Sequence, residues 1–375
     1  MDSETLKYTM NLNKDEACPS NQFPITYLQY MRAIQAFIEE NLIKLYDLVL
    51  LKSPNDAAIK SIDLVAEKRG ADYFPASVRV RTTHDNIWFA ANVALTERGL
   101  SRIERDYELL KYLGSKNDLN FLPQVFFINE PENSSASLTG SPNRIFLAEW
   151  FRDYHEFHIT GNVKGDTSIL SFWNTDKGYF ELSESVAFKI IEQISYILAS
   201  YYDLETYQEI YPWHHAAGDF IAKLDHGPDV KLISVRQYEP RVFFSGASYE
   251  NPNQALLFFL VNLMIRSRID RIDGTGRFAW LKGRFDKPVF YGFFKSIMRE
   301  KRLKHGGYDF LKKFIKTLDM LTLEDWTCLF VQAVESYDQR APDLGIIKDN
   351  LVEHILNVYQ TCRELLTNNK IYEIK

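Results

Sequence analysis

The order of secondary-structure patterns between residues 61 and 149 is the feature that most constrains the fold of this chain. Three strand patterns follow one another there, joined by short turns, at 61–68, 76–82 and 86–95. The middle one alternates valine and arginine from Val78 to Arg81, which is the period of a strand with one exposed face. Three consecutive strands joined by short turns predict an antiparallel meander.

A helix pattern and two further strand patterns come next. Ser101 and Glu104 have the spacing of a capping box, which predicts that a helix begins at Ser101. Its apolar residues recur at helical spacing and should form a buried stripe, namely Ile103, Tyr107, Leu110 and Leu113. The strand patterns at 121–130 and 144–151 are separated by a polar loop. Three strands, one helix and two strands predict a small α+β domain.

Helical patterns dominate after Phe151. Apolar residues recur on one face of 183–210, and the segment from about residue 251 onward has a helical pattern with aromatic anchors. A further helical pattern at 24–51 precedes the sheet. The expected organisation is a loose leader at 1–23, a helical extension at 24–59, an antiparallel sheet domain with one helix at 60–152 and a larger, mainly helical domain at 153–375.

Length and charge limit the classes of function. At 375 residues the chain exceeds the usual size of a single core, which predicts one elaborate domain or two lobes that share a cleft. The 44 Lys and Arg residues are outnumbered by 50 Asp and Glu residues. No bulk positive charge is therefore available to attract nucleic acid or an anionic membrane, and we expect neither as a partner.

Cysteine content and apolar runs indicate a soluble, cytoplasmic chain. The three cysteines, Cys18, Cys328 and Cys362, lie far apart and form no Cys-x-x-Cys pair, which fits a reducing compartment and argues against a zinc site. The polar N-terminal segment lacks the apolar core of a signal peptide. The longest apolar run, at 255–265, is about half of the roughly 20 residues needed to span a bilayer.

The order of patterns, together with the segment "AAGDFIAK" at 216–223, resembles the protein-kinase-like fold. Within that fold the aminoglycoside phosphotransferase and choline kinase branch is the most similar, and the resemblance spans about residues 60–345. It implies a two-lobed α+β protein with a small antiparallel five-stranded N-lobe carrying one helix and a larger, mainly helical C-lobe. It also implies a nucleotide in the interlobe cleft, with 147–157 at the linker.

This segment resembles the catalytic loop of the family, in which His-Gly-Asp presents an aspartate to the acceptor hydroxyl. Asp219 matches that aspartate and Gly218 the glycine, whereas Ala217 replaces the histidine. The resemblance makes Asp219 the candidate base, with His215 as a second candidate catalytic residue. Two structural alternatives stand beside these roles. Asp219 orders the loop by accepting backbone hydrogen bonds, and His214 and His215 pack or hydrogen-bond within it.

The metal-binding positions of the family are altered. The resemblance implies ATP and Mg²⁺ as cofactors, but Leu224 replaces its metal-ligating asparagine and Ser234 its second metal-ligating aspartate. Mg²⁺ prefers oxygen ligands and usually needs at least one carboxylate, so a leucine cannot bind it. Glu239 is the candidate replacement ligand, with Asp225 and Asp229 as neighbouring carboxylates. Because phosphoryl transfer depends on charge neutralisation, we expect it to be atypical or absent.

Contacts to a phosphate or another anion are expected from several residues. The candidate cofactor-binding residues are Lys68, Arg69, Gly70, Asp106 and Arg236. The first three lie where the family covers the phosphates, and the guanidinium of Arg236 has a fork of donors that suits an anion. Asp106 stands at the place of a glutamate whose lysine partner is missing from the strand at 86–95. The alternative for 67–73 is an exposed hairpin with solvated charges.

Three hypotheses about function follow. The first is a kinase-like-fold protein of the small-molecule phosphotransferase type that binds a nucleotide or another anionic ligand and, if active, phosphorylates a small-molecule hydroxyl. The second is a non-catalytic, pseudokinase-like module that binds a ligand or a partner. The third is a helical scaffold whose sheet is not a nucleotide lobe.

Overall fold

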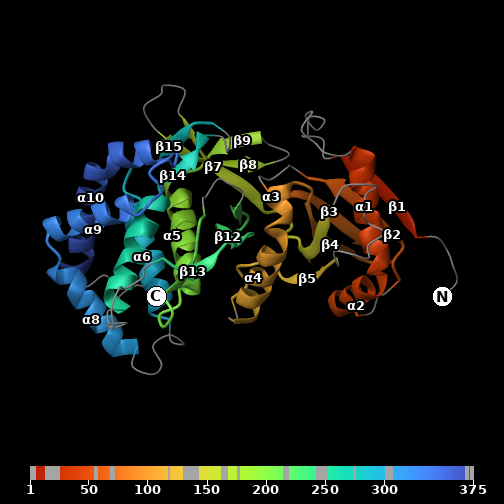
Figure 1. Ribbon diagram of the computed structural model, residues 1–375, viewed down its shortest axis with the longest axis horizontal. Helices are drawn as coiled ribbons and strands as arrows, with labels where there is room; N and C mark the ends of the chain where they lie inside the picture. Colours follow the sequence, from red (N-terminus) through yellow and green to blue (C-terminus); the bar gives the residue numbers. More distant parts are fainter. Residues whose placement is uncertain are drawn as a thin grey trace. The chain divides into compact units, whose positions relative to one another are not determined.

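A computed structural model describes residues 6–12, 26–54, 58–67, 72–116, 119–129, 143–161, 168–174, 178–213, 219–241, 252–272, 276–299, 307–367 and 371. The chain divides into two compact units, Met1–Asp153 (unit 1) and Tyr154–Lys375 (unit 2), and Figure 1 shows their elements in colours that follow the sequence. This division falls one residue after the boundary expected from the sequence. Helices and strands occur in both units, so the expected α+β class is confirmed.

Unit 1 contains a six-stranded sheet in the order β1-β2-β3-β4-β6-β5. Its strands are β1 (Lys7–Leu12), β2 (Ser61–Ala66), β3 (Phe74–Arg81), β4 (Asn86–Ala94), β5 (Val125–Ile128) and β6 (Arg144–Glu149). Neighbouring strands are antiparallel, except that β1 runs parallel to β2. The predicted meander and the two later strands are confirmed as five of these strands, and the expectation of a five-stranded sheet misses the sixth.

That sixth strand, β1, corrects the expectation of a loose leader at 1–23. It pairs with β2 so that Tyr8 lies opposite Ile62. Leu6, Tyr8 and Met10 pack against the apolar core of unit 1. The sequence does not predict this strand because its apolar residues alternate over only six positions inside a polar segment.

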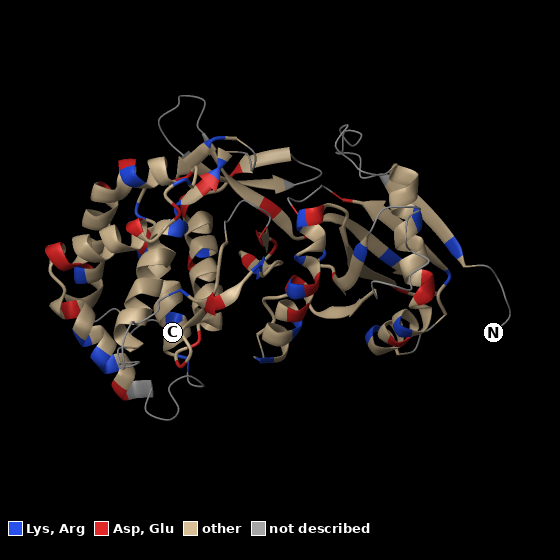
Figure 2. Ribbon diagram, viewed as in Figure 1, with Lys and Arg blue, Asp and Glu red and all other residues tan. Residues whose placement is uncertain are grey.

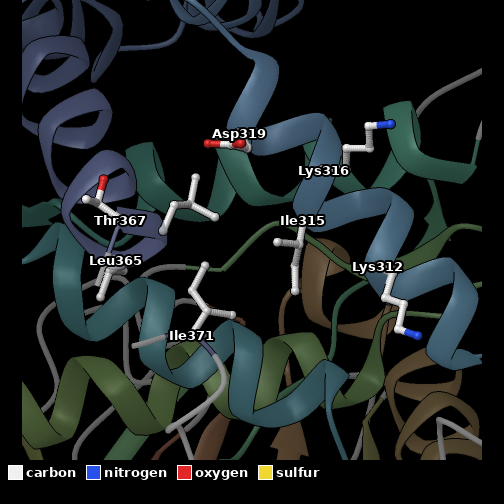
Figure 3. Close-up of a pocket in the computed structure, with 8 residues that line it drawn as sticks. Lys312, Ile315, Lys316, Asp319, Leu365, Thr367 and Ile371 are labelled. Carbon is white, nitrogen blue, oxygen red and sulfur yellow. The ribbon is translucent and has the colours of Figure 1, made fainter. Parts of the chain in front are cut away.

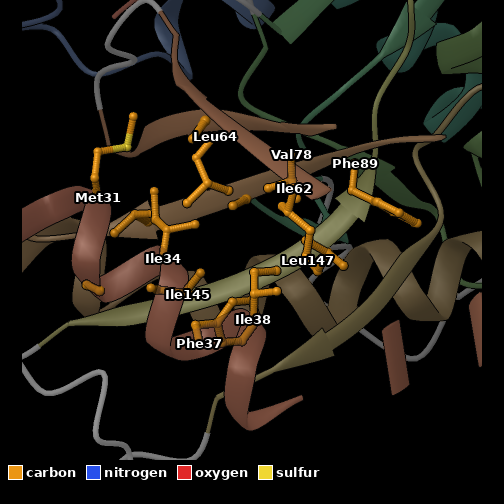
Figure 4. Close-up of a cluster of buried hydrophobic side chains, with 14 of the residues drawn as sticks. Met31, Ile34, Phe37, Ile38, Ile62, Leu64, Val78, Phe89, Ile145 and Leu147 are labelled. Atoms are coloured by element: carbon orange, nitrogen blue, oxygen red, sulfur yellow. The ribbon is translucent and has the colours of Figure 1, made fainter. Parts of the chain in front are cut away.

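Two helices complete the core of unit 1, namely α1 (Tyr27–Glu40) and α2 (Leu42–Lys52). They replace the single helix expected at 24–51, because the chain turns at Asn41, whose side-chain amide donates to the carbonyl of Phe37. Figure 4 shows apolar side chains of α1 gathered with those of four strands, and its labelled residues are Met31, Ile34, Phe37, Ile38, Ile62, Leu64, Val78, Phe89, Ile145 and Leu147. The helical segment is therefore part of the sheet's core and not a separate extension.

The predicted helix after the meander is α4 (Ile103–Lys116), which packs against β5 and β6 and buries its predicted apolar stripe. Its start differs from the expectation. A short helix, α3 (Glu97–Leu100), comes first and is capped by the side chain of Thr96. Ser101 ends α3, and its hydroxyl donates to the carbonyl of Arg98, so Ser101 is not the N-cap of a capping box.

Unit 2 contains an antiparallel sheet in the order β12-β11-β7-β8-β9. Its strands are β7 (His155–Gly161), β8 (Ser168–Asn174), β9 (Gly178–Glu181), β11 (Phe220–Lys223) and β12 (Asp229–Leu232). Two further antiparallel pairs join β10 (Gln208–Ile210) to β13 (Tyr238–Pro240) and β14 (Ile269–Arg271) to β15 (Phe278–Trp280). These strands correct the expectation of helices directly after Phe151. Buried Phe157 and Ile159 do alternate with polar neighbours, but over a run too short to identify a strand.

The helices of unit 2 are α5 (Glu184–Tyr201), α6 (Pro252–Arg266), α7 (Asp286–Ile297), α8 (Gly307–Met320), α9 (Leu323–Glu335) and α10 (Leu344–Thr367). Helix α5 packs against β10 and β12 and most extensively against α7. The apolar run at 255–265 forms most of α6 and is almost entirely buried. Among the residues that the structure describes, no helix is both long enough and apolar enough to cross a membrane.

The close packing of α5 on α7 depends on Gly292. A Cβ atom added to this glycine would lie 2.7 Å from the backbone nitrogen of Tyr196 and closer still to the carbonyl oxygen of Glu192. These are backbone atoms, so they cannot yield without a distortion of α5. At the same contact the hydroxyl of Ser195 donates to the carbonyl of Val289 at 2.6 Å.

We expect Gly292→Ala to lower the free energy of unfolding by about 2–3 kcal/mol, because overpacking a rigid contact forces the backbone to shift. Gly345→Ala in α10 is the matched control, since a Cβ atom there meets nothing within 4 Å. The control should raise stability by up to about 1 kcal/mol, because alanine favours a helix more than glycine does. Urea unfolding followed by circular dichroism measures both, and equal stability of Gly292→Ala and the wild type would contradict the close contact.

Candidate functional site

The β11–β12 hairpin brings together three of the residues identified from the sequence. Asp219 directly precedes β11, and Ser234 and Arg236 follow β12. Because the two strands are antiparallel, the start of β11 lies beside the end of β12. The amide of Ile233 continues the pairing by donating to the carbonyl of Asp219 at 2.8 Å.

The carboxylate of Asp219 is held by a two-point ion pair with Arg236. Nη2 of Arg236 lies 2.7 Å from Oδ1, and Nη1 lies 2.8 Å from Oδ2. The hydroxyl of Ser234 donates to Oδ1 at 2.6 Å. The Asp219 side chain is 2% exposed and that of Arg236 is 18% exposed. Removing one partner from a buried, bidentate pair of this kind typically costs about 3–5 kcal/mol.

These contacts favour a structural role for Asp219 over the role of a base. A general base needs a carboxylate oxygen that can reach the proton of the substrate. Both oxygens of Asp219 accept from Arg236, and one also accepts from Ser234. Arg236 additionally donates to the carbonyl of Pro212 at 3.3 Å. The group therefore orders the segments after β10, before β11 and after β12.

The position of Leu224 differs from the one that the family resemblance implies. Leu224 follows β11, whereas Asp219 precedes it. At about 3.3 Å per residue the two lie roughly 15 Å apart along the strand, too far to flank one metal ion. Within the described residues, no three or more His, Cys, Asp or Glu side chains are arranged to hold a metal ion.

Other candidate residues lie elsewhere. Glu239 lies on β13 with an exposed side chain. Asp106 is buried on α4 in unit 1 and accepts a hydrogen bond from the hydroxyl of Tyr73. Asp225 pairs with Lys223 at 3.2 Å. The candidates that fall outside the described residues are Lys68, Arg69, Gly70, His214, His215 and Gly218.

A second group of titratable side chains joins β7 to β14. Nε2 of His158 lies 3.2 Å from a carboxylate oxygen of Glu156, and its Nδ1 lies 3.9 Å from Oδ2 of Asp270. The same oxygen of Asp270 accepts from the amide of Ile159 at 2.9 Å. Glu156 lies opposite Ile221 of β11, so this group adjoins the strand that begins after Asp219.

The amino-acid sequence gives little indication of this second group. Its only signal is the spacing of Glu156 and His158, which lie two residues apart and therefore on the same face of a strand. Asp270 lies 111 residues from Ile159, so no local pattern indicates the contact. Burial raises the pKa of Asp270 to about 7, although the Ile159 amide and the imidazole of His158 oppose the rise.

A third group surrounds Tyr211 in unit 2. The guanidinium of Arg241 lies 3.9 Å from the centre of the Tyr211 ring and 4.0 Å from a carboxylate oxygen of Glu209. Arg266 lies 5.9 Å from the same ring centre and forms an ion pair with Asp343. Burial raises the pKa of Glu209 to about 8, and the charge of Arg241 opposes this rise. Cationic and anionic side chains are thus paired inside this unit.

A cavity of about 410 Å³ lies between α8 and α10 of unit 2. Figure 3 shows Ile315, Leu365 and Ile371 at this cavity, with Lys312 and Lys316 projecting from α8. Its lining residues include none of the candidates from the sequence. Figure 2 shows basic and acidic residues interspersed along the helices of unit 2, including those beside this cavity.

No protein-family model matches this chain, and no curated protein has significant sequence similarity to it.

Asp270→Asn should remove a pH dependence of stability. The pKa of Asp270 rises from 3.8 to about 7 on folding, so between these values the folded chain keeps a proton that the unfolded chain loses. The free energy of unfolding therefore falls as pH rises from about 4 to 7. The neutral asparagine should avoid that fall, so the free energy of unfolding of Asp270→Asn should not decrease between pH 4 and 7 as that of the wild type does.

Chemical denaturation at several pH values between 4 and 8 measures this effect. Asp349→Asn is the matched control, because Asp349 is exposed on α10. The control should follow the wild-type pH profile. Parallel profiles for Asp270→Asn and the wild type would show that Asp270 does not take up a proton on folding.

Proposed function

We propose that this chain is a kinase-like protein, similar in architecture to the small-molecule phosphotransferases, that binds a nucleotide or another anionic ligand and has lost metal-dependent phosphoryl transfer. The observation that carries the proposal is the two-point ion pair between Asp219 and Arg236. The proposal joins the anion-binding hypothesis to the pseudokinase-like alternative.

The topology of unit 1 supports the kinase-like part of the proposal. The resemblance implies three antiparallel strands, one helix and two strands in a single sheet. Strands β2, β3, β4, β6 and β5 are neighbours in that order, and α4 lies between β4 and β5 in the sequence. Strand β1 and helices α1 and α2 are additions to this pattern.

The geometry of unit 2 supports a different alignment of this chain with the family, shifted by five residues from the one described above. In the resemblance, a base aspartate precedes a metal-ligating asparagine by five residues, and a second metal ligand follows the next strand. Two ligands must lie side by side to share one ion. The residue beside Ser234 is Asp219. We therefore assign Asp219 to the asparagine position, and the base position falls on His214, which lies outside the described residues.

This assignment explains why ordinary catalysis should be lost. Transfer of a phosphoryl group is promoted by cations that bridge its oxygens and neutralise the developing charge. The carboxylate of Asp219 is already neutralised by Arg236, and Ser234 supplies no negative charge. A guanidinium can still bind a phosphate or carboxylate through directed hydrogen bonds. Ligand binding without transfer is therefore the function that these residues support best.

We expect no transfer from labelled ATP to a panel of small hydroxyl compounds, including aminoglycosides and choline, with either Mg²⁺ or Mn²⁺ present. ATP or inorganic triphosphate should nevertheless stabilise the protein, because a ligand at 100 times its Kd adds about 2.7 kcal/mol to the free energy of unfolding. Transfer assays and thermal unfolding with each compound measure the two effects.

Two results would reject the proposal. The first is turnover by the wild type that is abolished in Asp219→Asn and retained in the exposed control Asp349→Asn. That result would make Asp219 a catalytic residue. If no phosphate compound and no other small anion in a panel stabilises the chain, the proposal that it binds an anionic ligand is rejected.

A further inference from the structure

The kinase-like resemblance implies a divalent cation where its two metal-ligand positions meet, and the residues at that point do not fit one. A divalent cation such as Mg²⁺ needs oxygen ligands with open lone pairs. Both oxygens of Asp219 are bound by Arg236, and the hydroxyl of Ser234 is directed at the same carboxylate. The apolar Leu224 lies beyond the other end of β11.

A guanidinium, that of Arg236, lies at this point. We infer that Arg236 takes the place of the divalent cation, so that an anionic ligand binds to this chain without a metal. The binding of an anionic ligand rests on the proposed function, whereas the replacement of the cation by Arg236 does not. The guanidinium of Arg236 stays protonated at any physiological pH, so its bond to Asp219 does not depend on a metal.

The contacts of Arg236 are those that a bridging cation would make. Its Nη1 binds the carboxylate of Asp219 at 2.8 Å and the carbonyl oxygen of Pro212 at 3.3 Å. It thus links oxygen atoms from the segment after β10 and the segment before β11, while its own backbone follows β12. A metal ion at the same carboxylate would lie beside the guanidinium and be repelled by it.

Removal of the guanidinium should therefore uncover a metal site. In Arg236→Ala the buried carboxylate of Asp219 loses its counter-ion and lies next to the hydroxyl of Ser234. Carboxylate and hydroxyl oxygens are donors that suit Mn²⁺ and Mg²⁺. The wild type should show no response to these ions at this position, because the guanidinium already satisfies the carboxylate.

We expect thermal unfolding in a Mn²⁺ titration to separate the variants. Millimolar Mn²⁺ should raise the Tm of Arg236→Ala by about 2–4 °C and leave that of the wild type unchanged. Arg236→Gln is the second variant, because its amide can still donate to Asp219 while the charge is gone, and it should respond in the same direction. Arg284→Gln is the matched control, since Arg284 pairs with the exposed Glu364 in the same unit.

Two results of the Mn²⁺ titration would contradict the role of Arg236. A Mn²⁺ response in the wild type that Asp219→Asn removes would overturn the inference, as would the absence of a response in both Arg236 variants.

The ligand is tested separately with ATP in EDTA and in Mg²⁺. Metal-independent binding predicts that ATP stabilises the wild type equally in the two buffers. It also predicts that Arg236→Gln loses at least about tenfold in ATP affinity in EDTA.

Stabilisation by ATP only when Mg²⁺ is present would overturn metal-independent binding while leaving ligand binding intact. No stabilisation by ATP or inorganic triphosphate in either buffer would reject both the phosphate ligand and its metal-independent binding. In that case the Mn²⁺ titration still decides whether Arg236 occupies a cation position.

Discussion

The ion pair between Asp219 and Arg236 is the interaction on which the order of the candidate site in unit 2 depends. One guanidinium joins the residue before β11 to the carbonyl of Pro212 after β10 and to its own segment after β12. The three segments are therefore fixed relative to one another by a single side chain. Because Asp219 is buried, losing Arg236 removes the charged partner of its carboxylate, which costs more than losing an exposed pair.

Buried arginines paired with carboxylates recur in unit 2. Arg268 lies 2.6 Å from a carboxylate oxygen of Asp286, with side-chain exposures of 2% and 0%, and Arg266 is paired with Asp343. Pairs of this kind contribute less to net stability than apolar packing does, but an unpaired charge at the same place is strongly unfavourable. Burial moves the pKa of Asp270 toward neutrality, and the backbone amides of Ile159 and Arg271 and the imidazole of His158 oppose this rise without cancelling it. Unit 2 thus contains carboxylates that are paired with buried arginines and others, such as Asp270 and Glu209, whose pKa burial raises toward or above neutrality.

The sequence is sufficient to predict elements whose pattern repeats locally. Strands β2 to β4 and the buried face of α4 follow directly from periodicity. Strand β1 could not be predicted in this way, because its partner residues lie about 50 positions later and only the finished core defines its register. At the candidate site, the residue types at Asp219 and Arg236 were visible, but their contact depends on the pairing of β11 with β12. The contact between Asp270 and β7 spans 111 residues and depends on tertiary packing.

The parallel strand β1 has a consequence for how unit 1 is made. The ribosome synthesises β1 before α1, α2 and β2, yet β1 can pair only when β2 has formed. During translation its apolar side chains therefore stay exposed to solvent, or bound to a chaperone, until β2 is in place. Once in place, β1 covers backbone groups of β2 that would otherwise recruit a strand from another molecule. Pairing of β1 thus moves the open edge of the sheet from β2 to β1.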